Sequence, residues 1–111
     1  MAKDDYFVIV YKILAYLYVQ LKAGQPIDSD MLAAHGGLFH INESYHAYII
    51  TSLLDEGYVD GVRTKAWGGE EFLDLSQCRI TPHGIAYIFE NSLFEKAKKF
   101  LKDVKDVTPF V

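Results

Sequence analysis

The sequence has little of what enzyme, metal-binding and secreted-protein signatures require. Its 111 residues contain a single cysteine, Cys78, so no disulfide can form within the chain. It has no leader of the charged, apolar and small-residue kind, and no glycine-rich phosphate loop that opens a helix. No CxxC or HxxxH pair brings two metal ligands together. We therefore expect a cytoplasmic protein with no catalytic residues, no metal and no cofactor.

A long uninterrupted hydrophobic run is also missing. The most apolar stretch, Tyr6 to Leu21, contains Lys12 and four tyrosines, and it falls short of the ~20 apolar residues that span a bilayer. The stretch is therefore interpreted as a buried helix, with no role in a membrane. Half of the residues are hydrophobic and 14% are aromatic, which is typical of a chain that folds. Residues 1–111 are expected to form a single domain.

Positive charge is scarce in the first half of the chain. Up to Val62 there are three basic residues against eight acidic ones, whereas from Arg63 onward eight basic residues accompany seven acidic ones. Five of those eight are lysines between Lys96 and Lys105. A nucleic-acid binder concentrates positive charge on one surface, so any such surface is expected late in the chain.

Three helices are expected in the first half. The apolar residues from Asp5 to Ala23 predict a helix that is covered on both sides and ends at Gly24. A short helix capped by Asp28 or Ser29 runs through residues 31–33 and ends at the glycines 36–37. Asn42 is expected to cap the third helix, which has apolar residues at helical spacing and ends at Gly57.

The second half changes to residues that favour strands. Residues 58–67 and 72–80 predict a β-hairpin whose connection is formed by Gly68, Gly69, Glu70 and Glu71. Thr81 then caps a helix with Pro82 at its first position, and Ser92 with Glu95 has the spacing of a capping box that opens a last helix. The predicted class is α+β, mainly α. The order of elements is that of a winged helix, namely a helix-turn-helix, a hairpin wing and C-terminal helices.

Local sequence supports this order. Residues 53–59 resemble the junction between the third helix and the first wing strand of winged helices, and residues 80–88 resemble the junction that follows the wing. Within the second junction, Gly84 should let the new helix approach the hairpin closely. Blocks at residues 6–17, 55–62 and 80–102 resemble the YjcQ family, small proteins of Gram-positive bacteria and their phages. The resemblance implies a winged helix and no particular activity, because the family has no settled function.

Double-stranded DNA is one candidate partner. The third helix of a winged helix enters the major groove, and its solvent face is predicted to carry Ser44, Ala47, Tyr48, Thr51, Ser52 and Asp55. Of these, Ser44, Tyr48 and Thr51 are candidate contacts to bases or phosphates. In the wing, Arg63, Lys65 and Trp67 share one face at strand spacing, and Arg79 is expected on the neighbouring strand. Such a face could grip a phosphate backbone or stack on a base.

The charge pattern of the same region speaks against DNA. Residues 41–62 contain no lysine or arginine and include Glu43, Asp55, Glu56 and Asp60, although neutralising phosphates supplies most non-specific affinity. Alternatively, the wing is an ordinary charged strand edge with Trp67 folded onto the core. The late lysines likewise form either a second basic surface or the solvated face of a helix. A protein partner is therefore the second candidate, and the apolar first helix also predicts a homodimer.

An enzyme is the least favoured class. The four histidines fit turn, cap and surface roles, and a Cys78–His83 nucleophilic pair would need a pocket and a third, orienting group. Two hypotheses stay open from sequence: a DNA-binding regulator that uses the third helix with Arg63 and Lys65, and a protein-interaction module on a winged-helix frame.

Overall fold

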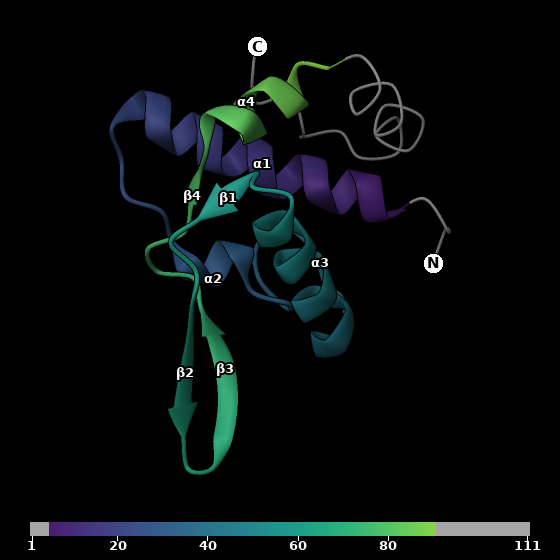
Figure 1. Ribbon diagram of the computed structural model, residues 1–111, viewed down its shortest axis with the longest axis vertical. Helices are drawn as coiled ribbons and strands as arrows, with labels where there is room; N and C mark the ends of the chain where they lie inside the picture. Colours follow the sequence, from purple (N-terminus) through teal and green to yellow (C-terminus); the bar gives the residue numbers. More distant parts are fainter. Residues whose placement is uncertain (1–4, 91–111) are drawn as a thin grey trace.

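The computed structural model describes residues 5–90 of the chain. The last expected helix, which Ser92 would open, and the five late lysines lie outside these residues. The described part belongs to the α+β class and is mainly helical (Figure 1). In chain order its elements are α1 (Asp5–Ala23), α2 (Ser29–Leu32), α3 (Glu43–Asp55), β1 (Val59–Asp60), β2 (Arg63–Trp67), β3 (Glu70–Asp74), β4 (Arg79–Ile80) and α4 (Pro82–Ile88).

Helix α1 is the centre of the core. None of its side chains from Tyr6 to Gln20 is exposed, as expected for a helix that is apolar on nearly all sides. It packs against α4 and β4, and the core it shares with α3 includes Leu14, Ile49 and Leu53. By length and composition, Tyr6–Ala23 could cross a membrane, but 44% of this window is buried inside the protein. Its packing is that of a core helix.

The predicted caps set the ends of α2 and α3. The Asp28 carboxylate accepts a hydrogen bond from the Asp30 amide at 3.0 Å, and the Asn42 side chain accepts one from the Tyr45 amide at 2.8 Å. Between the two helices the chain forms an isolated antiparallel bridge from His35 to His40. The two cap hydrogen bonds, from the Asp30 and Tyr45 amides, satisfy amides that the first turn of a helix leaves unpaired.

The predicted hairpin forms, but as two separate two-stranded sheets. β2 pairs with β3 in register from Arg63–Asp74 to Trp67–Glu70, whereas β1 pairs with β4. The break lies at Gly61, which has a φ of +82° and stands so close to the Gln77 carbonyl that a Cβ would lie 2.0 Å from that oxygen. The chain therefore bends there instead of running straight.

The turn at the tip of the hairpin is shorter than predicted. Only Gly68 and Gly69 connect the strands, with φ values of +61° and +84°, while Glu70 and Glu71 pair with Trp67 and Ala66 inside the ladder. Two consecutive residues with positive φ are typical of a two-residue turn that matches the twist of a hairpin. Because the connection holds two residues, it fixes the register of the strands.

A compact joint attaches α4 to the β1–β4 sheet. The Thr81 hydroxyl accepts a hydrogen bond from the Gly84 amide at 3.0 Å and donates to the Gly57 carbonyl, so the predicted N-cap also ties α4 to the turn after α3. Gly57 has a φ of +78°, which glycine adopts without penalty, and it follows the end of α3 as predicted. The prediction that Gly84 allows a close approach is confirmed, since a Cβ there would lie 2.2 Å from the Tyr58 carbonyl oxygen.

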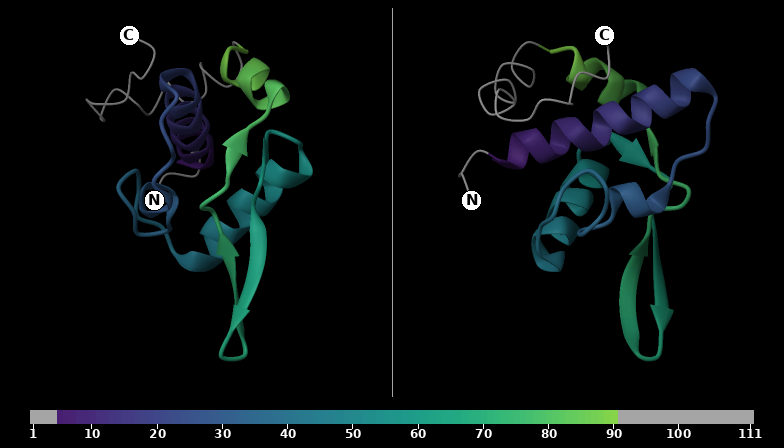
Figure 2. Two further views of the ribbon diagram at one scale, coloured as in Figure 1. Left: turned by 90° about the vertical axis from the view of Figure 1, so that its left-hand side faces the viewer. Right: turned by 180° about the vertical axis from the view of Figure 1, so that it is seen from behind.

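The β2–β3 hairpin projects from the body of the molecule, as all three views show (Figure 1 and Figure 2). Every residue of β2 is exposed, and so are the first three of β3. The hairpin is thus held at its base and is open to solvent along β2.

Candidate functional site

The solvent face of α3 is close to the predicted one. Ser44, Tyr48 and Thr51 are exposed, with Tyr48 65% accessible, and Ala47 and Asp55 lie on the same surface; Ser52 is half-buried instead. Exposed Glu43 and Glu56 stand at the two ends of the helix. The face therefore presents hydroxyl and carboxylate groups and no cation.

The register of the hairpin places the three predicted wing residues together. Directly paired residues of an antiparallel ladder point to the same face, so Arg63, Lys65 and Trp67 share a face with Asp74, Phe72 and Glu70. Trp67 is 80% exposed, which rules out the alternative in which its ring folds onto the core. The face combines two cations with two exposed aromatic rings and two carboxylates.

Two of the predicted cations are paired with carboxylates. The Lys65 Nζ lies 3.0 Å from Asp74 Oδ2, and the Arg79 guanidinium donates to the Asp60 carboxylate. Arg79 is also not on a strand next to Arg63 and Lys65, because β4 belongs to the other sheet. Within residues 5–90, Arg63 has no carboxylate within 4 Å, so it is the one of the three predicted cations without an ion pair there.

Asp74 is held in its charged form. The amide and hydroxyl of Ser76 donate to Asp74 Oδ1 at 3.0 and 2.7 Å. These hydrogen bonds, followed by the neighbouring Lys65, lower the pKa of the Asp74 carboxyl to about 2. The carboxylate that pairs with Lys65 is thus ionised throughout the physiological range.

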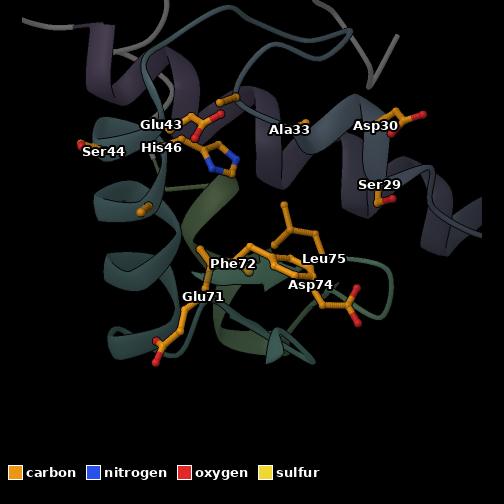
Figure 3. A pocket seen from close by; sticks show the side chains of 13 residues that line it. Ser29, Asp30, Ala33, Glu43, Ser44, His46, Glu71, Phe72, Asp74 and Leu75 are labelled. Atoms are coloured by element: carbon orange, nitrogen blue, oxygen red, sulfur yellow. The ribbon is translucent and has the colours of Figure 1, made fainter. Parts of the chain in front are cut away.

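A cleft that the sequence did not predict opens between the helices and the hairpin. It has a volume of about 610 Å³ and is bounded by α2, the first half of α3 and strand β3 (Figure 3). Four acidic residues line it, namely Asp30, Glu43, Glu71 and Asp74. The excess of acidic residues was visible in the sequence. Their meeting at one cleft was not predictable, because Asp30 and Asp74 are far apart along the chain.

The histidines and the cysteine do not converge on a reactive centre. His46 is buried on the core face of α3, with Nε2 2.7 Å from the Leu32 carbonyl oxygen, so its predicted turn, cap or surface role is wrong. His83 is exposed and stacks on Tyr58, with ring centroids 4.9 Å apart. Burial, with a smaller effect of Asp60, raises the pKa of the Cys78 thiol to about 12, so the thiol stays protonated. Among residues 5–90 no three metal-ligating side chains are grouped.

The ring of Tyr58 connects the turn after α3 to α4. The Tyr58 ring stacks in parallel on the Tyr87 ring, with centroids 4.3 Å apart, and it also stacks on the His83 ring, with centroids 4.9 Å apart. Burial raises the pKa of the Tyr87 phenol to about 12. This cluster packs α4 against the sheet, and its phenols stay neutral at physiological pH.

The family model described as YjcQ protein matches residues 11–107, almost the whole chain. The chain belongs to the YjcQ family. This confirms the resemblance noted in the sequence. The comparison with curated proteins gave no significant match, and neither did the comparison with solved structures.

Proposed function

We propose that this YjcQ-family chain is a cytoplasmic, non-enzymatic winged-helix domain that binds a protein partner and does not read duplex DNA. In this assignment α2 and α3 form the helix-turn-helix and the β2–β3 hairpin is the wing. The order of elements supports the assignment, because the short strand β1 and then the hairpin follow α3, and α4 comes after them and packs against α1 and β4.

The observation that carries the proposal is the pairing of Lys65, one of the two cations of the wing, with Asp74. A DNA-binding wing needs free positive charge for phosphates, and Arg79, outside the β2–β3 hairpin, is likewise paired with Asp60. The described part of the chain has five basic and eleven acidic residues. A surface of this charge repels a polyanion and attracts basic partners.

A second candidate function, DNA binding, is favoured by one observation. Arg63 and Trp67 are exposed on the same face of a hairpin that projects into solvent, which is where a wing contacts a phosphate backbone. In that case Ser44, Tyr48 and Thr51 of α3 would reach the major groove.

A titration against mixed-sequence duplex DNA at several salt concentrations separates the two functions. The full-length chain is compared with Arg63→Ala and Lys65→Ala. We expect no binding at low salt, or weak binding that neither substitution changes. Binding with a steep salt dependence that flattens in both variants would overturn the proposal in favour of the regulator.

We also propose that the chain forms a homodimer. Leu21 at the end of α1 and Phe89 after α4 are 56% and 57% exposed, and the Phe89 ring packs edge-on against Tyr18 with centroids 5.6 Å apart. Leu21 lies three residues after Tyr18 on α1 and so on the same face of the helix, and we infer that these residues form an apolar patch of the kind that marks an interface. Sedimentation equilibrium of the wild type and Leu21→Glu tests this, and a wild-type monomer at every concentration would exclude it.

A further inference from the structure

The acidic cleft has the form of a binding site for an extended segment. Five consecutive residues of the hairpin line it, from Glu71 to Leu75. Four of them, Glu71 to Asp74, belong to β3. Successive side chains of a strand point to opposite faces, so a cleft that touches all four lies along the edge of the strand and not over one face. Among residues 5–90, β3 pairs with β2 alone, and its other edge lies on the side of the hairpin toward α3, which also lines the cleft (Figure 1).

The outer edge of β3 carries backbone groups that can accept another strand. In a two-stranded antiparallel ladder, each strand uses only half of its amides and carbonyls in the pairing. The remaining groups of β3 point outward and form a template for an added strand. Five paired residues extend for about 17 Å along such an edge.

The acidic side chains around the cleft favour an occupant of positive charge. Asp30, Glu43 and Glu71 are exposed, and none of them has a lysine or arginine within 4 Å among residues 5–90. The fourth carboxylate, Asp74, is already paired with Lys65. Three unpaired carboxylates around one cleft favour a cationic occupant and repel nucleic acid.

Apolar side chains also line the cleft, between its acidic residues. Phe72 is 50% exposed, and Figure 3 shows its ring in the cleft, with Glu43 and His46 of α3 on one side and Asp30 of α2 on another. Ala33 and Ala47 leave room on the helices for side chains of an occupant. An apolar side chain placed between Phe72 and these alanines would be removed from water.

We propose that an extended, lysine- or arginine-rich segment of a protein partner binds in this cleft, adds a strand to the outer edge of β3 and places an apolar side chain on Phe72. The inference rests on the proposed protein-binding function and names the chemistry of the partner. Backbone pairing supplies affinity, and the three carboxylates select basic segments.

The test is a selection of random short peptides displayed on phage against the full-length chain. Selected peptides are then synthesised, and their affinities are measured by fluorescence anisotropy at low and high salt. We expect the selected peptides to carry net positive charge and to bind more weakly at high salt.

Matched variants locate the site. Glu71→Lys reverses a charge inside the cleft and should weaken binding about fivefold or more, whereas Glu70→Lys makes the same charge change one residue away, outside the lining, and should have little effect. Ala47→Trp fills the cleft from an exposed helix position and should abolish binding. Thr51→Trp, one turn further along α3, is its control. Circular dichroism of each variant verifies that it is folded.

Several outcomes would overturn the inference. They are the recovery of no peptides, the recovery of neutral or acidic peptides, and peptides that bind Glu71→Lys and Ala47→Trp as they bind the wild type. A dimer that dissociates on Glu71→Lys would mean that a second copy of the chain occupies the cleft instead. The DNA titration is independent of these results, so failure of the proposed function is recognised separately by salt-dependent binding to duplex DNA.

Discussion

Replacing Gly84 by alanine tests the joint between α4 and the sheet. Gly84 is buried in the first turn of α4, and its φ is not positive, so conformational freedom is not the reason for glycine there. An added Cβ would lie 2.2 Å from the Tyr58 carbonyl oxygen and 2.8 Å from Ile80 Cγ1. The Tyr58 oxygen cannot easily move, because it accepts the Thr81 amide at 3.0 Å.

Two opposing effects decide the sign of the change. Alanine is favoured over glycine inside a helix by about 1 kcal/mol. Overpacking against a fixed neighbour costs about 1–3 kcal/mol, and loosening the Thr81–Tyr58 hydrogen bond costs about 1 kcal/mol more. The net expectation is a loss of about 2 kcal/mol, equivalent to a fall in Tm of roughly 10 °C for a chain of this size.

Urea unfolding followed by circular dichroism measures the free energy of unfolding of Gly84→Ala and the wild type. Ala86→Gly, an exposed position of the same helix, is the matched control and should lose about 1 kcal/mol through helix propensity alone. A Gly84→Ala variant as stable as the wild type, or more stable, would refute the argument that α4 needs glycine to approach the sheet.

Three further predictions concern single side chains. Asn42→Ala removes the cap of α3 and should cost about 1 kcal/mol in urea unfolding, whereas the neighbouring Ser44→Ala should cost little. Because burial raises the pKa of the Cys78 thiol to about 12, a thiol reagent should label the native chain slowly and the unfolded chain at once; rapid native labelling would contradict this. The pKa of Asp74 is lowered to about 2, so its charge stabilises the fold above the ordinary carboxyl pKa and this contribution is lost as the pH falls through about 2. The unfolding free energy of Asp74→Asn should therefore fall less steeply with acid, and an unchanged slope would count against the Ser76 and Lys65 contacts.

The elements of the fold were predictable because their signals are local. Each of the caps at Asp28, Asn42 and Thr81 lies within three residues of the amide it binds. The Gly68–Gly69 turn was also readable, since two glycines between strand-forming segments are typical of a two-residue hairpin turn, yet the connection was predicted two residues too long. The exposed face of α3 followed from helical periodicity, which misplaced only Ser52.

The candidate site was less predictable because its members meet only through long-range packing. The residues Arg63, Lys65 and Trp67 were found from strand periodicity, but their charge balance depends on the register that sets Lys65 near Asp74. Arg79 was assigned to the wing, and it pairs instead with Asp60, 19 residues earlier in the chain. His46 was assigned a turn, cap or surface role, although its position on α3 faces the Leu32 carbonyl of α2.

By itself the sequence determined the family, the four helices within residues 5–90, the presence of a hairpin and the shortage of positive charge in the first half of the chain, because composition, periodicity and capping act over a few residues. Only the tertiary structure decided that the hairpin divides into two sheets at Gly61, that Lys65 is paired with Asp74 and that acidic side chains from α2, α3 and β3 surround one cleft. These features depend on how distant segments approach one another. Such approaches are set by the packing of the whole core and not by any one stretch of the chain.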